Sequence, residues 1–279
     1  MDLRKVLFLG GDGLRLASVQ VRCVDIARRL KCDYLLNKHY AYEIPDKYSA
    51  FVCVKPYLLP GELAELAKRG IVIWDIIDAS PPKEHASLYL ASTRITQEIF
   101  HSYGRTVVIP HHHCNFSSVP NPSNLRRPAW IGSSHWLPQL TGIKFDYYET
   151  NQMSQKLVVH ALRKIGIALN FRNNRPCIFH PKQQKNMHRL HASINSGIKL
   201  INCLGFGTPS ISADEPAYHE IGENCTIFTN IKKCASWVRA LQNDNDLYSE
   251  LRLRCLQKSE KYHLNAIAEK YIKLLNSLK

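Results

Sequence analysis

Two side chains in the second half of the chain are spaced so that both could hold one anionic ligand. Lys199 and Asn202 lie in the stretch KLINCLGFGTP, and on a helix these two positions share a face. A lysine ammonium binds phosphate as a point charge, and an asparagine amide can both donate to and accept from a sugar hydroxyl. The pair could therefore hold a diphosphate and a ribose. A solvated surface lysine before an ordinary glycine turn is the alternative, and these residues alone leave it open.

The residues that follow Asn202 predict how this helix ends. Gly205 and Gly207 suit the left-handed backbone at a helix C-terminus, and Pro209 prevents the helix from continuing. Residues 210–213 then predict a strand, and Pro216 suits the first turn of another helix. Two further cations lie upstream in FRNNR, Arg172 and Arg175; they could replace Lys199 at a diphosphate or lie on the surface.

The chain as a whole alternates short apolar runs with helix-like segments. Runs such as KVLFL (5–9), AFVCV (50–54) and IVIWDII (71–77) are typical of parallel strands that are buried on both faces. Strands that alternate with helices predict an α/β fold. Because such sheets bind ligands beyond the carboxyl ends of their strands, we expect functional loops after residues 9, 54, 77 and 109.

The amino-acid composition changes at residues 117–128, SSVPNPSNLRRP, which are rich in Ser, Pro and Asn as linkers are. A second alternation of strands and helices follows. A chain of 279 residues is long enough for two domains. We expect an N-terminal domain at 1–122, a C-terminal domain at 123–279 and a ligand cleft between them, with the last helix packing back on the N-terminal domain.

Composition limits the class of protein. No apolar run reaches the ~20 residues that span a bilayer, and the nine scattered cysteines lack a C-x-x-C pair, which fits a reducing cytoplasm. The net charge of +14 favours an anionic partner: a nucleotide, a phospholipid surface or nucleic acid. The chain shows no zinc finger, no aromatic-basic RNA motif and no basic tail, so nucleic acid is not expected.

Polar loops follow the first strand of each half. Gly10 and Gly11 could face the cleft, although a tight turn explains them equally well. Gly132, Ser133 and Ser134 could supply backbone and hydroxyl donors to a phosphate, or form an ordinary polar loop.

Carboxylates and histidines mark the N-terminal half. Asp75 and Asp78 end an apolar strand, where a carboxylate could orient an acceptor hydroxyl or act as a base; for Asp78, capping the next helix is the alternative. Neighbours in the run 111–113, HHH, point to opposite sides of an extended chain, so the three cannot all face one metal. We expect His111 to touch substrate and no metal to be bound.

Residues 199–221 resemble the nucleotide-binding signature of GT-B glycosyltransferases, especially the large retaining family of group 1, or family 4-like, enzymes. The positions in register are Lys199, Leu200, Ile201, Gly207, Pro209, Ile211, Ala213, Pro216, Tyr218, Glu220 and Ile221. The tail, from 237 onward, is similar to the closing helices of that family. The likeness covers 199–279 well and 1–120 more weakly.

The resemblance implies two Rossmann-like domains and a glycosyltransferase that uses a UDP- or GDP-linked sugar. It further implies a retaining, metal-independent mechanism without a cofactor, and a polysaccharide, lipid-linked glycan or other glycoconjugate as acceptor. Such an enzyme is expected in the cytoplasm, at the membrane surface where basic residues contact lipid. Lys199 would contact the diphosphate, with Gly207, Thr208 and Glu215 lining the donor site.

The sequence departs from the family pattern at three places. Asn202 stands where the family has a ribose-binding glutamate, and Ile194 stands at the earlier glutamate. The loop WIGSSHW (130–136) replaces one that carries a diphosphate-binding arginine and lysine. The donor site is thus rebuilt or degraded, and a catalytically silent GT-B-like nucleotide- or glycan-binding protein is the alternative.

Overall fold

The computed structural model describes residues 1–11, 17–36, 41–77, 81–150, 153–172 and 196–278. These residues form two compact α/β units. Unit 1 comprises Met1–His112 and Leu264–Lys279, and unit 2 comprises His113–His263. Each unit is built on its own parallel sheet.

Unit 1 contains a six-stranded parallel sheet with the order β2-β1-β3-β4-β5-β6. Its strands are β1 Val6–Gly10, β2 Asp33–Leu36, β3 Ala50–Val54, β4 Ile71–Ile76, β5 Leu88–Ala91 and β6 Thr106–Val108. Its helices are α1 Ala17–Val19, the π-helix η3 Gln20–Val24, α2 Asp25–Leu30, α3 Pro60–Arg69, α4 Arg94–Ile99 and α11 Leu264–Ser277, with short 3₁₀ turns η1 Leu3–Lys5, η4 Ala41–Glu43 and η5 His101–Tyr103.

Alternate residues of the strands in unit 1 pack into two hydrophobic cores, one on each face of the sheet. Val6 and Phe8 on β1 pack with helices α2 and α11, whereas Leu7 and Leu9 face the opposite side, where α3 lies. This alternation is the geometry of a pleated strand. Both faces of the sheet are therefore covered, as the apolar runs predict.

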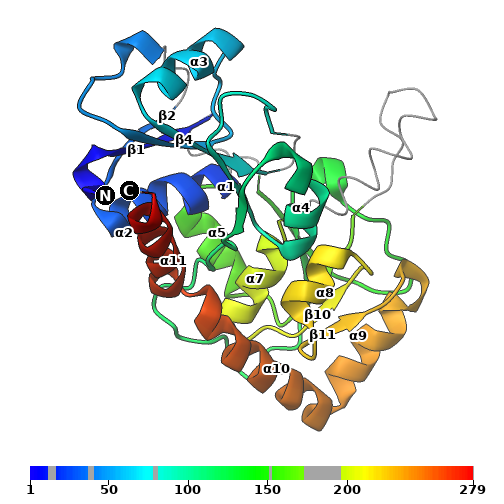
Figure 1. The fold of residues 1–279 in the computed structure, drawn as a ribbon. Helices are drawn as coiled ribbons and strands as arrows, with labels where there is room; N and C mark the ends of the chain where they lie inside the picture. The colour runs from blue at the N-terminus through cyan, green and yellow to red at the C-terminus, as the bar shows by residue number, and fades with distance from the viewer. Residues whose placement is uncertain (12–16, 37–40, 78–80, 151–152, 173–195, 279) are drawn as a thin grey trace, which may run out of the picture. The chain divides into compact units, whose positions relative to one another are not determined.

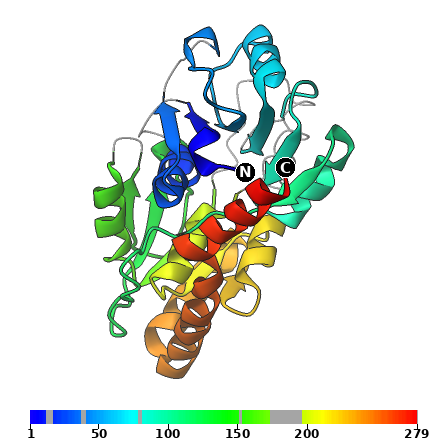
Figure 2. The same ribbon diagram turned by 60° about the vertical axis from the view of Figure 1, so that its left-hand side comes forward.

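The last helix, α11, packs on unit 1 beside α2 (Figure 1). Its Tyr271 ring lies 6.0 Å from the Phe8 ring, and Leu274 and Leu275 are buried in the same core. The two chain ends lie side by side in both views (Figures 1 and 2), and the N-terminal ammonium donates to Oδ1 of Asn276 at 3.2 Å. Unit 1 is thus closed by the final helix of the chain.

Unit 2 contains a five-stranded parallel sheet with the order β11-β10-β9-β7-β8. Its strands are β7 Pro128–Gly132, β8 Asp146–Glu149, β9 Ile167–Asn170, β10 Ser210–Ser212 and β11 Thr226–Phe228. Its helices are α5 Gln155–Leu162, α7 Ile198–Gly205, α8 Pro216–Gly222, α9 Cys234–Asn243 and α10 Asn245–Ser259, with short 3₁₀ turns η6 Ser134–Trp136, η7 Ile231–Lys233 and η8 Glu260–Tyr262.

Unit 2 begins ahead of the predicted boundary at residue 123, because the expected linker is tied into this unit. The backbone N–H of His113 donates to the carbonyl of Tyr262 at 2.9 Å. The Asn121 amide donates to the carbonyls of Leu162 and Ile165 at 2.9 and 3.0 Å. These interior hydrogen bonds join residues that are distant in sequence, so composition alone does not predict them.

The stretch around Lys199 folds largely as expected. The helix that carries Lys199 and Asn202, which we expect to begin at about residue 187, is described from Ile198 onward, and β10 and a helix starting at Pro216 follow it. Gly207 has the predicted left-handed backbone, with φ of +61°. Gly205 instead lies within α7, where a Cβ would come within 2.5 Å of the His113 ring; glycine there serves close packing. We also expect a strand from the apolar residues near 177–180, and these positions lie outside the described residues.

No helix in the described ranges is long and apolar enough to cross a membrane.

The packing of α11 predicts different losses of stability for two substitutions on this helix. Leu275 is fully buried, whereas Ile272 is 36% exposed. We expect Leu275→Ala to lower the free energy of unfolding by about 2–5 kcal/mol, because it leaves a cavity in the unit 1 core. Ile272→Ala should change it by less than about 1 kcal/mol. Urea denaturation followed by circular dichroism measures both, and equal losses would contradict this placement of α11.

Candidate functional site

The strand order of the second sheet reverses at β7, which has β8 on one side and β9 on the other. Loops from neighbouring strands diverge at such a point and leave a crevice for ligands beyond the carboxyl ends. The pairing of β7 with β9 joins Pro128 to Ile167 and Ala129 to Ala168, at the start of β7. The carboxyl ends of the two strands are therefore free to separate. Lys199 reaches this end of β7.

Lys199 is carried on the first turn of α7. This helix starts after Gly197, whose left-handed backbone (φ +65°) and contact with Ile221 leave no room for a side chain. Leu200 and Leu204 are fully buried and hold the opposite face of the helix against the core. Lys199 is half-buried at the start of the helix, where backbone N–H groups have no partner within the helix and the dipole favours an anion.

The Lys199 amine rests on an aromatic ring. Its Nζ lies 4.1 Å from the ring centroid of Trp130, which is fully buried on β7. The Trp130 Nε1 donates to the carbonyl of Phe171 at 2.8 Å, directly after β9. Gly132 stands two residues beyond Trp130, and a Cβ there would lie 2.6 Å from the Lys199 Nζ. The missing side chain of Gly132 therefore lets the amine reach the ring.

Burial makes the charge on this amine costly. It lowers the pKa of Lys199 from its ordinary value to about 7, and the nearby Arg172 guanidinium lowers the pKa further, whereas Glu215 and Cys203 act in the opposite sense. Within the described part of the chain, the structure gives the Lys199 Nζ neither a hydrogen-bond acceptor nor a salt-bridge partner. A group of this kind gains most from an anion supplied by a ligand.

Glu215 is another predicted residue that the structure brings to Lys199. It is buried at the N-cap of α8, and its charge acts on the amine. Arg172, weighed as an alternative cation, is also near enough to affect the amine. Lys199, Arg172 and Glu215 thus gather at the ends of β7, β9 and β10.

Four predicted donor residues are held by the protein itself. The Asn202 Oδ1 accepts from the backbone N–H of Cys114 at 2.9 Å, and the buried Thr208 hydroxyl accepts from Asn121 at 3.1 Å. The backbone N–H of Ser134 donates to the Glu149 carboxylate at 2.7 Å. Gly207 packs against the side chain of Leu256. These contacts anchor the loops and helix of unit 2; donor contacts by these residues stay predictions. Ser133 is half-buried and occupies the N-cap position of η6.

In unit 1, the glycine pair lies at the end of β1, where the first sheet reverses its strand order. Gly10 ends β1, and the backbone N–H of Gly11 donates to the carbonyl of Val54 at 3.1 Å. A Cβ on Gly11 would lie 2.0 Å from the carbonyl oxygen of Lys55. The close approach of the backbone at position 11 to the Lys55 carbonyl therefore requires glycine there.

The structure places Asp75 inside unit 1 and not at a surface that an acceptor hydroxyl can reach. Its carboxylate forms a salt bridge with Arg22, and both side chains are at most 1% exposed. Arg22 also donates to the carbonyl of Ile109 at 2.6 Å. Burial of a charge requires such a partner, so the position of Asp75 matches a structural ion pair. Asp78 lies outside the described residues, as does Arg175.

His111 is also fully enclosed in unit 1. Among the described residues, neither ring nitrogen has a hydrogen-bond partner, and burial, followed by the Arg22 charge, holds the pKa of this imidazole well below its ordinary value. His112 lies beside it, with Nε2 2.9 Å from the carbonyl of Val21. His111 is therefore neutral at physiological pH, and contact with substrate stays a prediction. The described residues contain no cluster of three or more acidic, histidine or cysteine ligands that could hold a metal ion.

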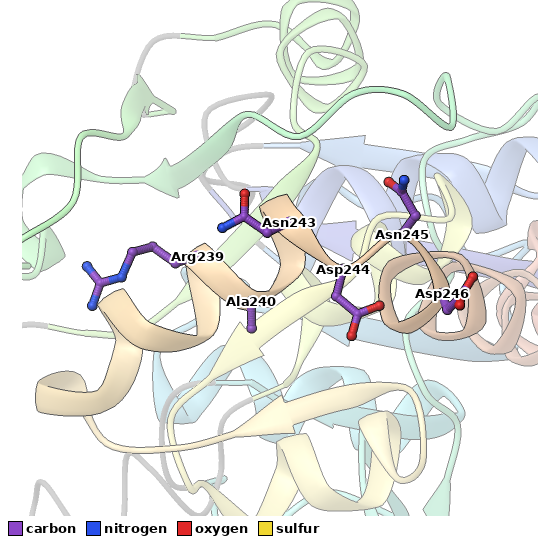
Figure 3. Close-up of a pocket in the computed structure, with 6 residues that line it drawn as sticks. All are labelled: Arg239, Ala240, Asn243, Asp244, Asn245 and Asp246. Atoms are coloured by element: carbon purple, nitrogen blue, oxygen red, sulfur yellow. The ribbon is translucent and has the colours of Figure 1, made fainter.

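A surface hollow between α9 and α10 offers no comparable arrangement. It is lined by Arg239, Ala240, Asn243, Asp244, Asn245 and Asp246. Figure 3 shows these side chains projecting from the two helices in different directions. Asp244 caps α10 by accepting from the Leu247 N–H at 2.9 Å. The polar residues that line this open hollow therefore belong to the end of α9 and the start of α10.

Comparison with known proteins relates the fold to solved glycosyltransferases. No family model matches the chain, and no curated protein sequence is significantly similar to it. The structure is similar to HepE of Anabaena in complex with UDP and glucose, with a TM-score of 0.65 and 12% identity over 99% of this chain and 100% of that one.

The chain is also similar to two further solved structures. A glycosyltransferase of Rickettsia africae has a TM-score of 0.66 and 9% identity, over 99% of this chain and 98% of that one. Sucrose-phosphate synthase of Thermosynechococcus elongatus has a TM-score of 0.61 and 10% identity, over 99% of both chains. At these identities the likeness concerns the fold. It confirms the predicted α/β class and the GT-B fold of two Rossmann-like domains; membership of the retaining family stays a prediction.

The buried ion pair of unit 1 gives a testable stability difference. We expect Asp75→Asn to lower the free energy of unfolding by about 3–5 kcal/mol, because it leaves the Arg22 charge buried without a counter-ion. Glu65→Gln breaks an exposed pair with Lys68, whose side chains are 45% and 73% exposed, and should cost about 0–1 kcal/mol. Chemical denaturation of both variants provides the comparison. A D75N variant as stable as E65Q would refute a structural ion pair.

Proposed function

We propose that the chain is a glycosyltransferase that binds a nucleotide-sugar donor on unit 2, at the carboxyl ends of β7 and β9. The observation that carries this proposal is the desolvated amine of Lys199 at the point where the strand order of a GT-B fold reverses. The similar HepE structures were solved with UDP and with UDP-glucose, which supports a nucleoside diphosphate as the ligand.

The chemistry explains why the amine is useful. Transfer of the sugar breaks its bond to the diphosphate, which accumulates negative charge as it leaves. Pre-placed cations and backbone N–H groups offset that charge, and they act most strongly where water is excluded. Lys199 supplies the cation, and the first turn of α7 supplies N–H groups directed toward the same anion. The approaching diphosphate in turn favours the protonated amine.

The finer assignments belong to the same proposal. The mechanism is retaining and uses neither a metal nor a separate cofactor, with the cations of unit 2 stabilising the leaving diphosphate. The acceptor is a polysaccharide, a lipid-linked glycan or another glycoconjugate that binds to unit 1. The net charge of +14 supports a cytoplasmic protein that contacts an anionic membrane surface, where lipid-linked acceptors are found.

A second candidate is a catalytically silent protein of the same fold that binds a nucleotide or glycan. Two predicted donor contacts favour it, because they are already used inside unit 2. Asn202 is engaged by Cys114, and the Ser134 N–H is engaged by Glu149. Such a protein would bind the diphosphate through Lys199 and lack transfer.

The proposal predicts that UDP or GDP binds in isothermal titration calorimetry at pH 7. Lys199→Met should weaken that binding at least tenfold, which corresponds to about 1.4 kcal/mol, because it removes the cation that faces the diphosphate. Lys164→Met changes an exposed lysine of the same unit and should leave the affinity unchanged. Absence of binding to either diphosphate by the wild-type chain would contradict the proposal.

Incubation with UDP-glucose and related donors separates the two candidates. An enzyme hydrolyses or transfers the sugar of at least one donor, even slowly, and loses that activity in Lys199→Met. Binding without any release of UDP would favour the silent protein.

A further inference from the structure

We propose that Trp130 is a positioning residue that holds the Lys199 amine in a desolvated slot, and that binding of a nucleoside diphosphate there is coupled to uptake of a proton. The inference rests on the proposed function, since it concerns the same donor site. Sequence analysis indicates Trp130 only as a member of the loop 130–136, which departs from the family pattern. Its contact with the Lys199 amine is visible in the tertiary structure.

The Trp130 ring is held rigidly. It is fully buried in the core formed with Leu169 and Phe171, and its Nε1 is fixed by the 2.8 Å hydrogen bond to the Phe171 carbonyl. The Tyr147 ring of β8 packs on it at 5.7 Å between centroids. Contacts from the strands on both sides of β7 therefore set the orientation of the face that the Lys199 Nζ meets at 4.1 Å.

Gly132 completes the slot. Residues 130 and 132 point to the same side of β7, because side chains alternate along a strand. A Cβ at position 132 would lie 2.6 Å from both the Lys199 Nζ and the Trp130 Cη2. Any side chain there would push the amine away from the ring. The slot thus depends on the large flat side chain of Trp130 and on the absence of a side chain at Gly132.

The surroundings of the slot leave the charge of the amine incompletely compensated. An aromatic face attracts a cation, yet it replaces only part of the lost hydration. The charged groups near the amine are Arg172 after β9, which opposes protonation, and Glu215 at the start of α8, which favours it; Cys203 is the titratable group on α7 itself. Near pH 7 the free protein therefore holds the amine partly as –NH₂ and partly as –NH₃⁺.

A bound diphosphate changes that balance. Its charge favours –NH₃⁺, so the amine of each neutral molecule takes a proton from solvent as the ligand binds. The affinity should then fall as the pH rises above 7, by up to tenfold per pH unit, because the free protein must gain a proton first. The second phosphate ionisation of the ligand, near pH 6, does not interfere between pH 7 and 9.

The linkage is measured by calorimetry of UDP binding at pH 8 in two buffers with different ionisation enthalpies. The wild-type chain should take up close to one proton for each UDP bound, and Lys199→Met should take up none. UDP binding without proton uptake by the wild-type chain would overturn the inference and leave the proposed function standing.

The role of Trp130 is tested by three variants, with a second readout that needs no nucleotide. The rate at which acetic anhydride labels Lys199, followed by mass spectrometry as a function of pH, reports the titration of the amine. Trp130→Phe keeps an aromatic face and should keep a midpoint near pH 7. Trp130→Leu admits water, and Gly132→Ala displaces the amine. Both should raise the midpoint by at least one pH unit and reduce the proton uptake.

The labelling result distinguishes the two proposals. If UDP does not bind the wild-type chain, the proposed function fails, and a midpoint near 7 that rises in Gly132→Ala still supports the slot. A midpoint near that of an ordinary lysine in the wild-type chain overturns it. An unchanged midpoint in folded Trp130→Leu and Gly132→Ala would show that Trp130 serves only the core.

Discussion

The contact between the Lys199 amine and the Trp130 ring is the interaction on which this interpretation of the molecule depends. It takes a cation out of water without giving it a carboxylate within salt-bridge distance among the described residues. Folding energy is used to hold the amine there, because an ammonium is more stable in water or beside a counter-ion. Such strain at one site is a physical reason to infer a ligand.

The rest of unit 2 serves to hold this contact in place. The reversal of strand order at β7 separates the loops that would otherwise cover the site. Hydrogen bonds of Asn202 and Thr208 tie helix α7 and the turn after it to the segment 113–122, through Cys114 and Asn121. Unit 1 shows the same principle with a different result: its buried Arg22 and Asp75 neutralise each other, so they add rigidity. The Lys199 amine has no such counter-ion within salt-bridge distance in the described part of the chain, and this difference is why we infer a ligand for it.

Local patterns in the sequence predict much of this fold. The strand at 50–54 matches the structure to the residue, and those at 5–9 and 71–77 match within one residue at each end, because buried parallel strands are uninterrupted apolar runs. Strands β8 and β11 have no such signal, since they are short edge strands with partly exposed side chains. The residues of the candidate site also differ in whether the sequence predicts them. Lys199 follows from its spacing and from a family resemblance, whereas the role of Trp130 depends on a contact across 69 positions of sequence, which no local pattern encodes.

The protonation state of Lys199 can be observed by NMR. Lysine labelled with ¹³C and ¹⁵N in its side chain is titrated with and without UDP, and the Lys199 signal is assigned by its loss in Lys199→Met. We predict a midpoint near pH 7 in the free protein and a shift toward the ordinary lysine value of about 10.4 when UDP is bound. A free amine that already titrates near 10.4, or one whose midpoint UDP leaves unchanged, would contradict the interpretation.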